Sequence, residues 1–426
     1  DGKAGPAAPK LLWAVKSQDQ FIAAPVPLGD RLVVSGFGAF NVSTFSVLST
    51  DPKAAERVAW SKTTPYLKLP TVSSPAVADG KLVFGDGMHQ TDGATLHCLR
   101  ADTGLPLWQL PVPGSLVHLE GSPTVEKGRV YLGGGAAGVL CVDMNRVTLE
   151  GKEMDLAAIQ KLLDAKWAAL MKKYQEDLKK DPDFAVKPTE DQLPKPSPLK
   201  VWEQGKEKWH VDAPVAVAGD RVLAASAFLE HEKVGDRVLF CLDAKTGEVK
   251  WRTPLAQNPW GGPTVTGDLV IVGGSNIRFD PKTLSGAQGE VAAYKLADGK
   301  EVWRKELKAG VLSCAAVADG LAVVTATDGK VRAYEVKSGE LRWHYDGKAP
   351  FFAAPAVAGG VVYAGDLKGV LHAVGLADGK EKWTLQVPGM FYGGPVVAGG
   401  RIYAATCNLE GPNAGKPTAV VCVGEK

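Results

Sequence analysis

The sequence predicts an all-β protein, an eight-bladed β-propeller built from four-stranded antiparallel blades. The first observation is a phrase ending in Trp, with Gly four positions earlier, that occurs five times: ADTGLPLW (residues 101–108), DAKTGEVKW (243–251), LADGKEVW (296–303), VKSGELRW (336–343) and LADGKEKW (376–383). The second is that Pro follows a Trp by twelve positions in five places, at Pro25, Pro214, Pro263, Pro355 and Pro395. Repetition at such an interval indicates structural units that pack on one another.

One repeat, residues 351–383, divides into four segments that favour β-strands. These segments are FFAAPAV, VVYAGD, VLHAVGL and EKWTLQV, and turns that contain Gly separate them. This pattern is typical of consecutive antiparallel hairpins. Because one four-stranded sheet cannot bury both of its faces, neighbouring units must pack against it, and radial packing gives a propeller.

The number of blades follows from the residues that mark the first strands, which are Pro25, Pro75, Pro123, Pro214, Pro263, Ala315, Pro355 and Pro395. The C-terminal unit stops after its third strand, whereas KLLWAVK near the N-terminus reads as a fourth strand that no first strand precedes. We therefore expect residues 11–15, with Trp13, to complete the last blade and close the ring. Closure would also remove a strand edge that invites aggregation.

A helical and Pro-rich insertion, residues 146–199, is expected inside the third blade of a single propeller domain that spans residues 1–426. A helix is predicted from about Asp155 to Lys180, because six apolar side chains fall on one face of it: Leu156, Ile159, Leu163, Trp167, Leu170 and Tyr174. Asp155 can cap its start, and Pro182 marks its end. The apolar face favours packing on the propeller, and the alternative is an arm that binds a partner.

Composition excludes several classes of function. The chain has 426 residues and a formal net charge of +2, and no apolar run approaches the length of a transmembrane helix. It has no basic run with interleaved aromatic residues, so we expect no nucleic-acid partner. Four of the six cysteines occupy equivalent third-strand positions: Cys98, Cys141, Cys241 and Cys422. Since other blades carry Ala there, small buried packing residues are favoured over a metal or redox site.

The segment CLDAKTGEVKW (residues 241–251) resembles the quinoprotein-type repeat, roughly LYALDAxTGKxxW, of pyrroloquinoline quinone (PQQ) dehydrogenases and PQQ-like propellers. The resemblance covers nearly the whole chain except about residues 146–199. It implies an eight-bladed ring in a bacterial protein exported to the periplasm or cell envelope, although no leader is present in this chain. The family includes enzymes and non-enzymatic scaffolds, among them the propeller lipoprotein of the bacterial β-barrel assembly machine.

The resemblance to the enzymes is incomplete. Many PQQ dehydrogenases place an adjacent Cys-Cys disulfide against the quinone and hold Ca²⁺ with Glu, Asn and Asp side chains. This chain has no adjacent pair of cysteines. It also shows no convergent set of oxygen ligands for a hard cation. The histidines show no catalytic or ligand spacing, and adjacent Glu230, His231 and Glu232 are not expected to converge on an ion, so no catalytic residue and no metal site is predicted.

Candidate binding residues lie where the first strands begin, around one mouth of the central channel. The positions just before the first strands are rich in aromatic residues with a few polar ones, such as His118 and Glu120. Such a ring suits a ligand or peptide site, whereas the alternative is that these side chains fill the channel. The residues that we single out are Trp209, His210, Trp260, Phe351 and Tyr392, with Arg278 from the long loop at residues 273–290.

These observations favour a non-catalytic, exported binding or scaffold protein that acts as a monomer and has no cofactor. Its partner is expected to be a protein or peptide segment held at the aromatic mouth and the long loops. The alternative is a PQQ-dependent oxidoreductase that binds the quinone, with Ca²⁺, at the channel mouth near Trp260.

Overall fold

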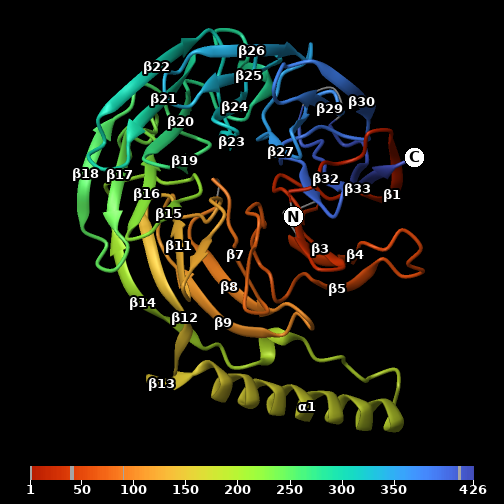
Figure 1. Ribbon diagram of the computed structural model, residues 1–426. Helices are drawn as coiled ribbons and strands as arrows, with labels where there is room; N and C mark the ends of the chain where they lie inside the picture. The colour runs from red at the N-terminus through yellow and green to blue at the C-terminus, as the bar shows by residue number, and fades with distance from the viewer. Residues whose placement is uncertain (1, 39–42, 90, 411–413) are drawn as a thin grey trace.

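The computed structural model describes residues 2–38, 43–89, 91–410 and 414–426, and the strands within these ranges form eight antiparallel sheets around a central axis (Figure 1). The first two blades contain β2 (Val26–Leu28), β3 (Arg31–Phe37), β4 (Ser43–Ser49) and β5 (Val58–Lys62), and then β6 (Ala76–Ala78), β7 (Lys81–Gly85), β8 (Ala94–Arg100) and β9 (Pro106–Val112). The third contains β10 (Thr124–Glu126), β11 (Arg129–Gly133), β12 (Val139–Leu149), β13 (Lys152–Asp155) and β14 (Ser197–Gln204).

The next two blades contain β15 (Ala216–Ala218), β16 (Arg221–Ser226), β17 (Val238–Asp243) and β18 (Val249–Pro254), and then β19 (Pro263–Thr266), β20 (Leu269–Ser275), β21 (Gly289–Lys295) and β22 (Glu301–Leu307). The two after them contain β23 (Ala316–Ala318), β24 (Leu321–Thr325), β25 (Lys330–Glu335) and β26 (Leu341–Asp346), and then β27 (Ala356–Ala358), β28 (Val361–Gly365), β29 (Val370–Gly375) and β30 (Glu381–Gln386). The last blade combines β31 (Val396–Ala398), β32 (Arg401–Ala405) and β33 (Thr418–Glu425) with β1 (Pro9–Ser17). The predicted eight-bladed propeller is confirmed.

The repeated Trp lies opposite a small residue of the third strand in most blades. Trp108 is paired with Cys98, and Trp251 with Cys241. Ala takes the same place opposite Trp303, Trp343 and Trp383. All six cysteines are free, and the four at third-strand positions are fully buried. The expectation that these thiols are small packing residues is therefore confirmed.

Each of these indoles also reaches the next unit of the ring. In seven cases the indole N–H donates a hydrogen bond of 2.7–3.3 Å to a backbone carbonyl there: Trp60 to Ala101, Trp108 to Met144, Trp202 to Ala244, Trp251 to Leu296, Trp303 to Val336, Trp343 to Leu376 and Trp383 to Pro6. The Trp residues thus join blades to one another, which explains their repetition along the chain.

The Gly that precedes each Trp receives the indole of the preceding blade. Gly104 and Gly247 have φ values of +70° and +77°, in the left-handed region that favours glycine. A Cβ atom on Gly104 would lie 2.6 Å from the ring of Trp60, and one on Gly247 would lie 2.6 Å from the ring of Trp202. The glycine therefore serves both its own turn and the packing between blades.

The strand β1 is the outermost strand of the last blade, next to β33 (Figure 1). Their antiparallel register runs from Pro9 opposite Glu425 to Ser17 opposite Thr418, with Trp13 opposite Cys422. Trp13 is 8% exposed and packs in a cluster with side chains of the first blade, Leu32 and Leu48 among them. Residues from the two ends of the chain thus form one sheet.

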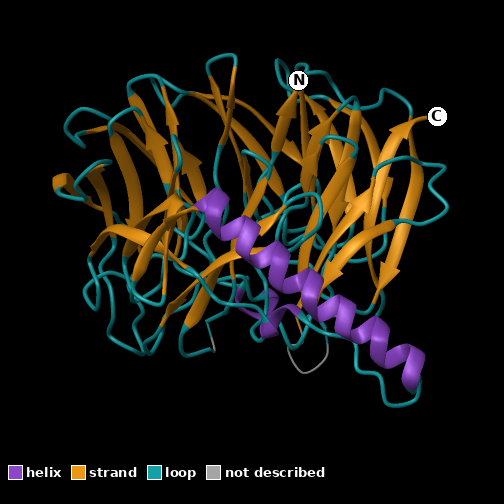
Figure 2. Ribbon diagram, turned by 90° about the horizontal axis from the view of Figure 1, so that it is seen from below, coloured by secondary structure: helices purple, strands orange, loops and turns teal. Residues whose placement is uncertain are grey.

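The predicted helix is present as α1 (Leu156–Lys180), and the Asp155 side chain caps it by accepting a hydrogen bond from the backbone N–H of Ala158 at 2.8 Å. Leu156, Ile159 and Leu163 are buried in the cluster that contains Trp108 of β9. An ion pair of 3.1 Å joins Asp164 to Arg100. The first half of α1 therefore packs on the rim, and its C-terminal end extends past the strands (Figure 2).

The rest of the insertion is less regular. The third strand β12 continues into a hairpin with β13, which the sequence analysis did not predict. After α1 the chain returns to the ring through a short 3₁₀ turn, Glu190–Gln192, and Leu193 is buried beside the helix. Among the described residues, no helix combines the length and the apolar character needed to cross a membrane.

Candidate functional site

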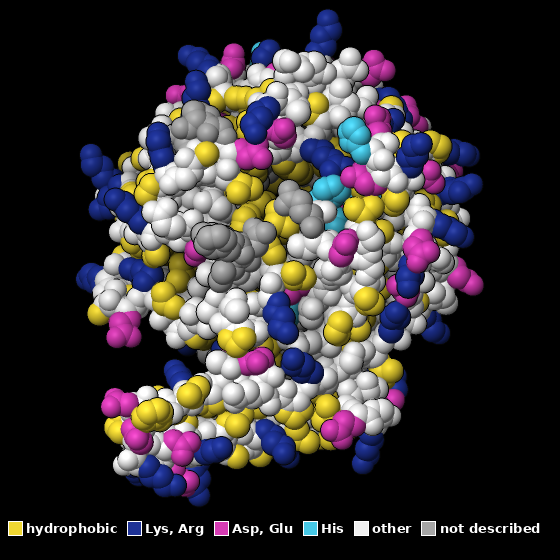
Figure 3. Space-filling model, turned by 180° about the vertical axis from the view of Figure 1, so that it is seen from behind, with side chains coloured by type: hydrophobic (Ala, Val, Ile, Leu, Met, Phe, Trp, Pro, Cys, Tyr) yellow, Lys and Arg dark blue, Asp and Glu magenta, His cyan; other side chains and the backbone are white. Residues whose placement is uncertain are grey.

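The loops from second to third strands and the connections between blades meet at one mouth of the central channel. A pocket of about 380 Å³ opens there, lined by Ile22, Val72, Met88, His89, Glu120, Asp212, Pro214, Trp260, Arg278, Phe279, Asp280, Tyr392, Leu409 and Glu410. Figure 3 shows hydrophobic side chains lining the hollow at the centre of this face and histidines beside it. We call this cavity the mouth pocket.

Aromatic rings form the apolar wall of the mouth pocket. Phe352 packs edge-on against Tyr392, with ring centroids 5.4 Å apart, and against Phe279 at 5.9 Å. Trp260 and Tyr392 are 9% and 8% exposed, yet the indole N–H and the phenol O–H have no hydrogen-bond partner among the described residues. Buried Trp and Tyr usually satisfy these groups, so two buried polar atoms of this wall are left without a partner.

The opposite wall contains three histidines that come from different loops. His89 follows β7, His118 lies between β9 and β10, and His210 lies between β14 and β15. One ring nitrogen of each lies within 4.8 Å of the others, and the ring centroids are 5.2–6.1 Å apart. His118 and His210 are fully buried, whereas His89 is partly exposed in the pocket wall. We call this group the three-histidine cluster.

Carboxylates surround the three-histidine cluster. An oxygen of Asp212 lies 2.9 Å from Nε2 of His210, and the same carboxylate lies 3.6 Å from Nδ1 of His118. Glu120 approaches Nδ1 of His118 to 3.5 Å. Burial opposes ionisation of Asp212, but the neighbouring histidines, His210 above all, lower its pKa. Burial and the charge of Asp212 raise the pKa of Glu120 well above its usual range.

Burial also keeps two of the histidines neutral. It lowers the pKa of His118 to about 4, against an ordinary value of 6.5. The pKa of His89 is lowered by burial and by the positive charge of Arg278. Neutral imidazole has a free lone pair, so at neutral pH these side chains can act as metal ligands.

Arg278 connects the two walls of the mouth pocket. Its guanidinium donates a hydrogen bond of 2.9 Å to Nε2 of His89 and lies 5.1 Å from the ring centroid of Trp260. The Asp280 carboxylate, in the same loop as Arg278, accepts a hydrogen bond from the backbone N–H of Lys282 at the start of a short 3₁₀ helix, Pro281–Thr283.

The structure places four of the six singled-out residues at this mouth. Trp260, Tyr392 and Arg278 line the pocket, and His210 belongs to the three-histidine cluster. Trp209 instead stacks on Phe240 of β17, with ring centroids 3.9 Å apart, in the packing between two blades. Phe351 is likewise buried, between β25 and β28, so neither residue lines the described pocket.

The three-histidine cluster was not predicted from the sequence. His118 and His210 were named among the residues at the mouth, but His89 was regarded as isolated, because the three lie far apart along the chain and follow no ligand spacing. The available signal was that each lies in a loop expected at the same mouth. Of the adjacent residues Glu230, His231 and Glu232, Glu232 comes within 3.7 Å of His89, while Glu230 pairs with Arg237 at 2.9 Å.

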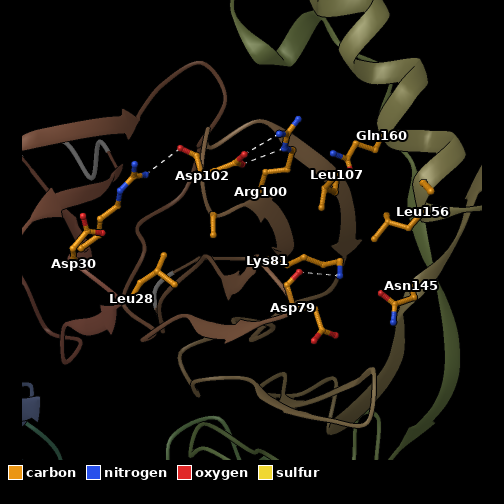
Figure 4. Close-up of a pocket in the computed structure, with 14 residues that line it drawn as sticks. Leu28, Asp30, Asp79, Lys81, Arg100, Asp102, Leu107, Asn145, Leu156 and Gln160 are labelled. Carbon is orange, nitrogen blue, oxygen red and sulfur yellow. Dashed lines mark hydrogen bonds and ion pairs between the residues drawn. The ribbon is translucent and has the colours of Figure 1, made fainter. Parts of the chain in front are cut away.

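A second cavity, of about 750 Å³, lies on the other face, between the turns of the first blades and the start of α1 (Figure 4). Its cationic side chains already have partners. Arg100 forms an ion pair with Asp102 at 2.9 Å, Arg31 donates to the carbonyl of Asp102 at 3.2 Å, and Lys81 donates to the carbonyl of Asp79 at 3.4 Å. Because these cations are already engaged, the mouth pocket is the better candidate.

This chain is similar to a known protein family and to several solved structures. A family model described as outer membrane protein assembly factor BamB matches residues 5–166, 196–286 and 280–406, which is most of the chain. No curated protein matches this chain. Similar solved structures include BamB from Moraxella catarrhalis, with 15% sequence identity, a TM-score of 0.62 and 97% of each chain covered. They also include a europium-containing methanol dehydrogenase, with 13% identity and a TM-score of 0.61, where 98% of this chain and 93% of that chain are covered.

A quinohemoprotein alcohol dehydrogenase from Comamonas testosteroni is also similar (15% identity, TM-score 0.62), with 99% of this chain and 77% of that chain covered. At these identities the structural likeness shows the fold alone. One fold carries both an assembly factor and oxidoreductases, so the residues of the site must decide between them.

Proposed function

This chain belongs to the family of the outer membrane protein assembly factor BamB, and from that premise we propose that it is a non-catalytic binding protein of the bacterial cell envelope. It acts as a monomer and holds a segment of a partner protein in the mouth pocket. The family description names an assembly factor, a role that requires contact with other proteins. The expected PQQ-like propeller family is thereby confirmed, while the choice between scaffold and enzyme depends on the pocket.

The observation that carries the proposal is the composition of the mouth pocket. One wall is aromatic and includes Trp260 and Tyr392. Four acidic side chains, Glu120, Asp212, Asp280 and Glu410, also line the pocket, with Arg278 as the cation. An extended peptide segment with an apolar or aromatic side chain next to Lys or Arg suits this pocket. The apolar or aromatic side chain can pack on the aromatic wall, and the basic side chain can pair with the acidic residues.

The same composition argues against the quinone alternative. PQQ carries three carboxylates, and the acidic side chains Asp212, Asp280 and Glu410 would repel them. Arg278, which could attract an anion, already donates to His89. Ca²⁺ prefers six to eight oxygen ligands, whereas histidine nitrogens dominate the buried part of this site. The flat ring of Trp260 remains the one feature that suits a quinone.

The proposal is tested by titrating the protein with fluorescent eight-residue peptides that contain an aromatic residue next to Lys. We expect saturable binding that weakens when Glu replaces that Lys, because the pocket is acidic. Trp260→Ala should weaken binding by about 30-fold, as expected for a central interface Trp. Leu341→Ala, on the outer strand β26 and 45% exposed, is the matched control and should bind as the unaltered protein does.

A parallel titration with PQQ and Ca²⁺, followed by calorimetry and absorption, separates the two functions. Tight binding of one PQQ per chain would overturn the scaffold proposal. Equal binding of the Lys and Glu peptides, or equal binding by Trp260→Ala, would show that the mouth pocket is not the contact site.

A further inference from the structure

We infer that the three-histidine cluster is a binding site for a divalent transition metal ion of the Zn²⁺ class, with one coordination position facing the mouth pocket. The inference goes beyond peptide binding, since the three ligands are side chains of this chain that can bind an ion whether or not a partner is present. One ring nitrogen each from His89, His118 and His210 would supply the ligands.

Unpartnered buried atoms are the first argument. Both ring nitrogens of His118 and Nδ1 of His210 have no hydrogen-bond partner among the described residues, and both side chains are 0% exposed. Burying a polar atom without a partner is unfavourable, so native proteins rarely leave three such atoms together. A bound cation accounts for one nitrogen of each ring, because it takes up a lone pair that no protein donor reaches. Nδ1 of His118 lies 3.5 Å from Glu120 and 3.6 Å from Asp212, which leaves Nε2 of that ring for the ion.

Geometry is the second argument. A Zn–N bond of about 2.0–2.1 Å places the nitrogens of a tetrahedral site about 3.4 Å apart. The three nitrogens lie within 4.8 Å of one another, so small ring movements complete the site. Three imidazole ligands leave the fourth position open, as in sites that bind water or a substrate group. His89, Glu120 and Asp212 line the mouth pocket, so that position is reached from the pocket.

The surrounding charges are the third argument. Asp212 lies 2.9 Å from Nε2 of His210 and so leaves Nδ1 of that ring for the ion. A carboxylate that holds the outer nitrogen of a ligand histidine is typical of zinc sites. Glu232 adds negative charge at 3.7 Å from His89, and a carboxyl oxygen of Glu120 lies 3.5 Å from Nδ1 of His118. Arg278, at 2.9 Å from His89, is the opposing positive charge.

The test uses the full chain after treatment with a chelator. Titration with Co²⁺, a spectroscopic probe for tetrahedral nitrogen sites, should give visible absorption bands that saturate at one ion per chain, and Zn²⁺ should displace the Co²⁺ and remove them. Calorimetry with Zn²⁺ should give the same stoichiometry. Neither readout depends on a peptide partner, so failure of the proposed function and failure of the metal site are distinguishable.

Substitutions locate the site. His118→Gln and His210→Gln should each weaken Zn²⁺ binding by at least about 100-fold, and Asp212→Asn by about 10- to 100-fold. Arg278→Gln should tighten binding, since it removes the nearby positive charge. His344→Gln, at an exposed position of β26, is the control and should bind Zn²⁺ as the unaltered chain does.

His89 is partly exposed, so His89→Gln tests the site even if a substitution at a buried ligand prevents folding. The inference is overturned if no ion binds stoichiometrically. It is equally overturned if His89→Gln and His118→Gln, both shown to be folded by circular dichroism, bind Zn²⁺ no more weakly than His344→Gln does.

Discussion

Trp13 offers a direct test of how the ring is held closed. The side chain is 8% exposed, lies 6.3 Å from the ring of Tyr403 on β32, and has the guanidinium of Arg57 at 4.7 Å from its ring centroid. It packs in one cluster with Phe21 and Leu32, so it joins the last blade to the first. Replacing it with Ala removes this packing and leaves a cavity between two blades.

The size of the effect follows from these contacts. Truncating a buried Trp to Ala generally costs about 3–5 kcal/mol. The indole N–H of Trp13 has no partner among the described residues, in contrast to that of Trp251, which donates to the carbonyl of Leu296. Since no hydrogen bond is lost, we expect Trp13→Ala to lower the free energy of unfolding by about 3 kcal/mol, the lower end of this range.

The assay is urea-induced unfolding followed by circular dichroism. Leu11→Ala is the matched control, because Leu11 lies on the same strand but is 43% exposed, and such a surface change should cost less than about 0.5 kcal/mol. Equal stability of the two variants would refute the account of closure through Trp13. Deleting residues 1–16 should in addition expose the edge of β33 and cause concentration-dependent association, which light scattering detects.

Two further substitutions test the packing between blades and on the rim. Gly247→Ala should lower the free energy of unfolding by about 1–3 kcal/mol more than Gly219→Ala does. Both glycines have positive φ, but only at Gly247 would a Cβ atom meet a Trp ring. Equal thermal stability of the two variants would contradict the docking of Trp202 on Gly247. Ile159→Ala should lower the free energy of unfolding in urea by about 2–5 kcal/mol, since Ile159 of α1 is fully buried against the ring. An effect no larger than that of exposed Lys161→Ala would mean that the helix does not stabilise the ring.

The sequence predicted the blades well because each blade carries its own local signal. A Trp, a Gly four positions earlier and a Pro twelve positions later recur within single blades or at their junctions. The helix was predicted for the same reason, since its apolar face and the cap at Asp155 are both local. Features that depend on neighbouring residues along the chain are the ones that a single sequence reveals.

The site is formed by residues that are distant along the chain, and only some of them were predicted from the sequence. The mouth was expected from the position of loops relative to strands. Trp260, Tyr392 and Arg278 were predicted as binding residues for that reason. Whether a side chain at the mouth points into the channel or between blades depends on the local twist of each connection. Trp209 therefore packs on Phe240, although its neighbour His210 belongs to the three-histidine cluster.

The small residue opposite the repeated Trp in most blades also makes the ring a convenient scaffold for site-directed labelling. Alanine already fills this position at Ala293, Ala333 and Ala373, so the same exchange at the four buried third-strand thiols follows a solution that the protein itself uses. A chain in which Cys314 and Cys407 are replaced as well could then carry a single introduced cysteine on any loop of the mouth. A fluorophore or spin label attached there would report on that loop alone.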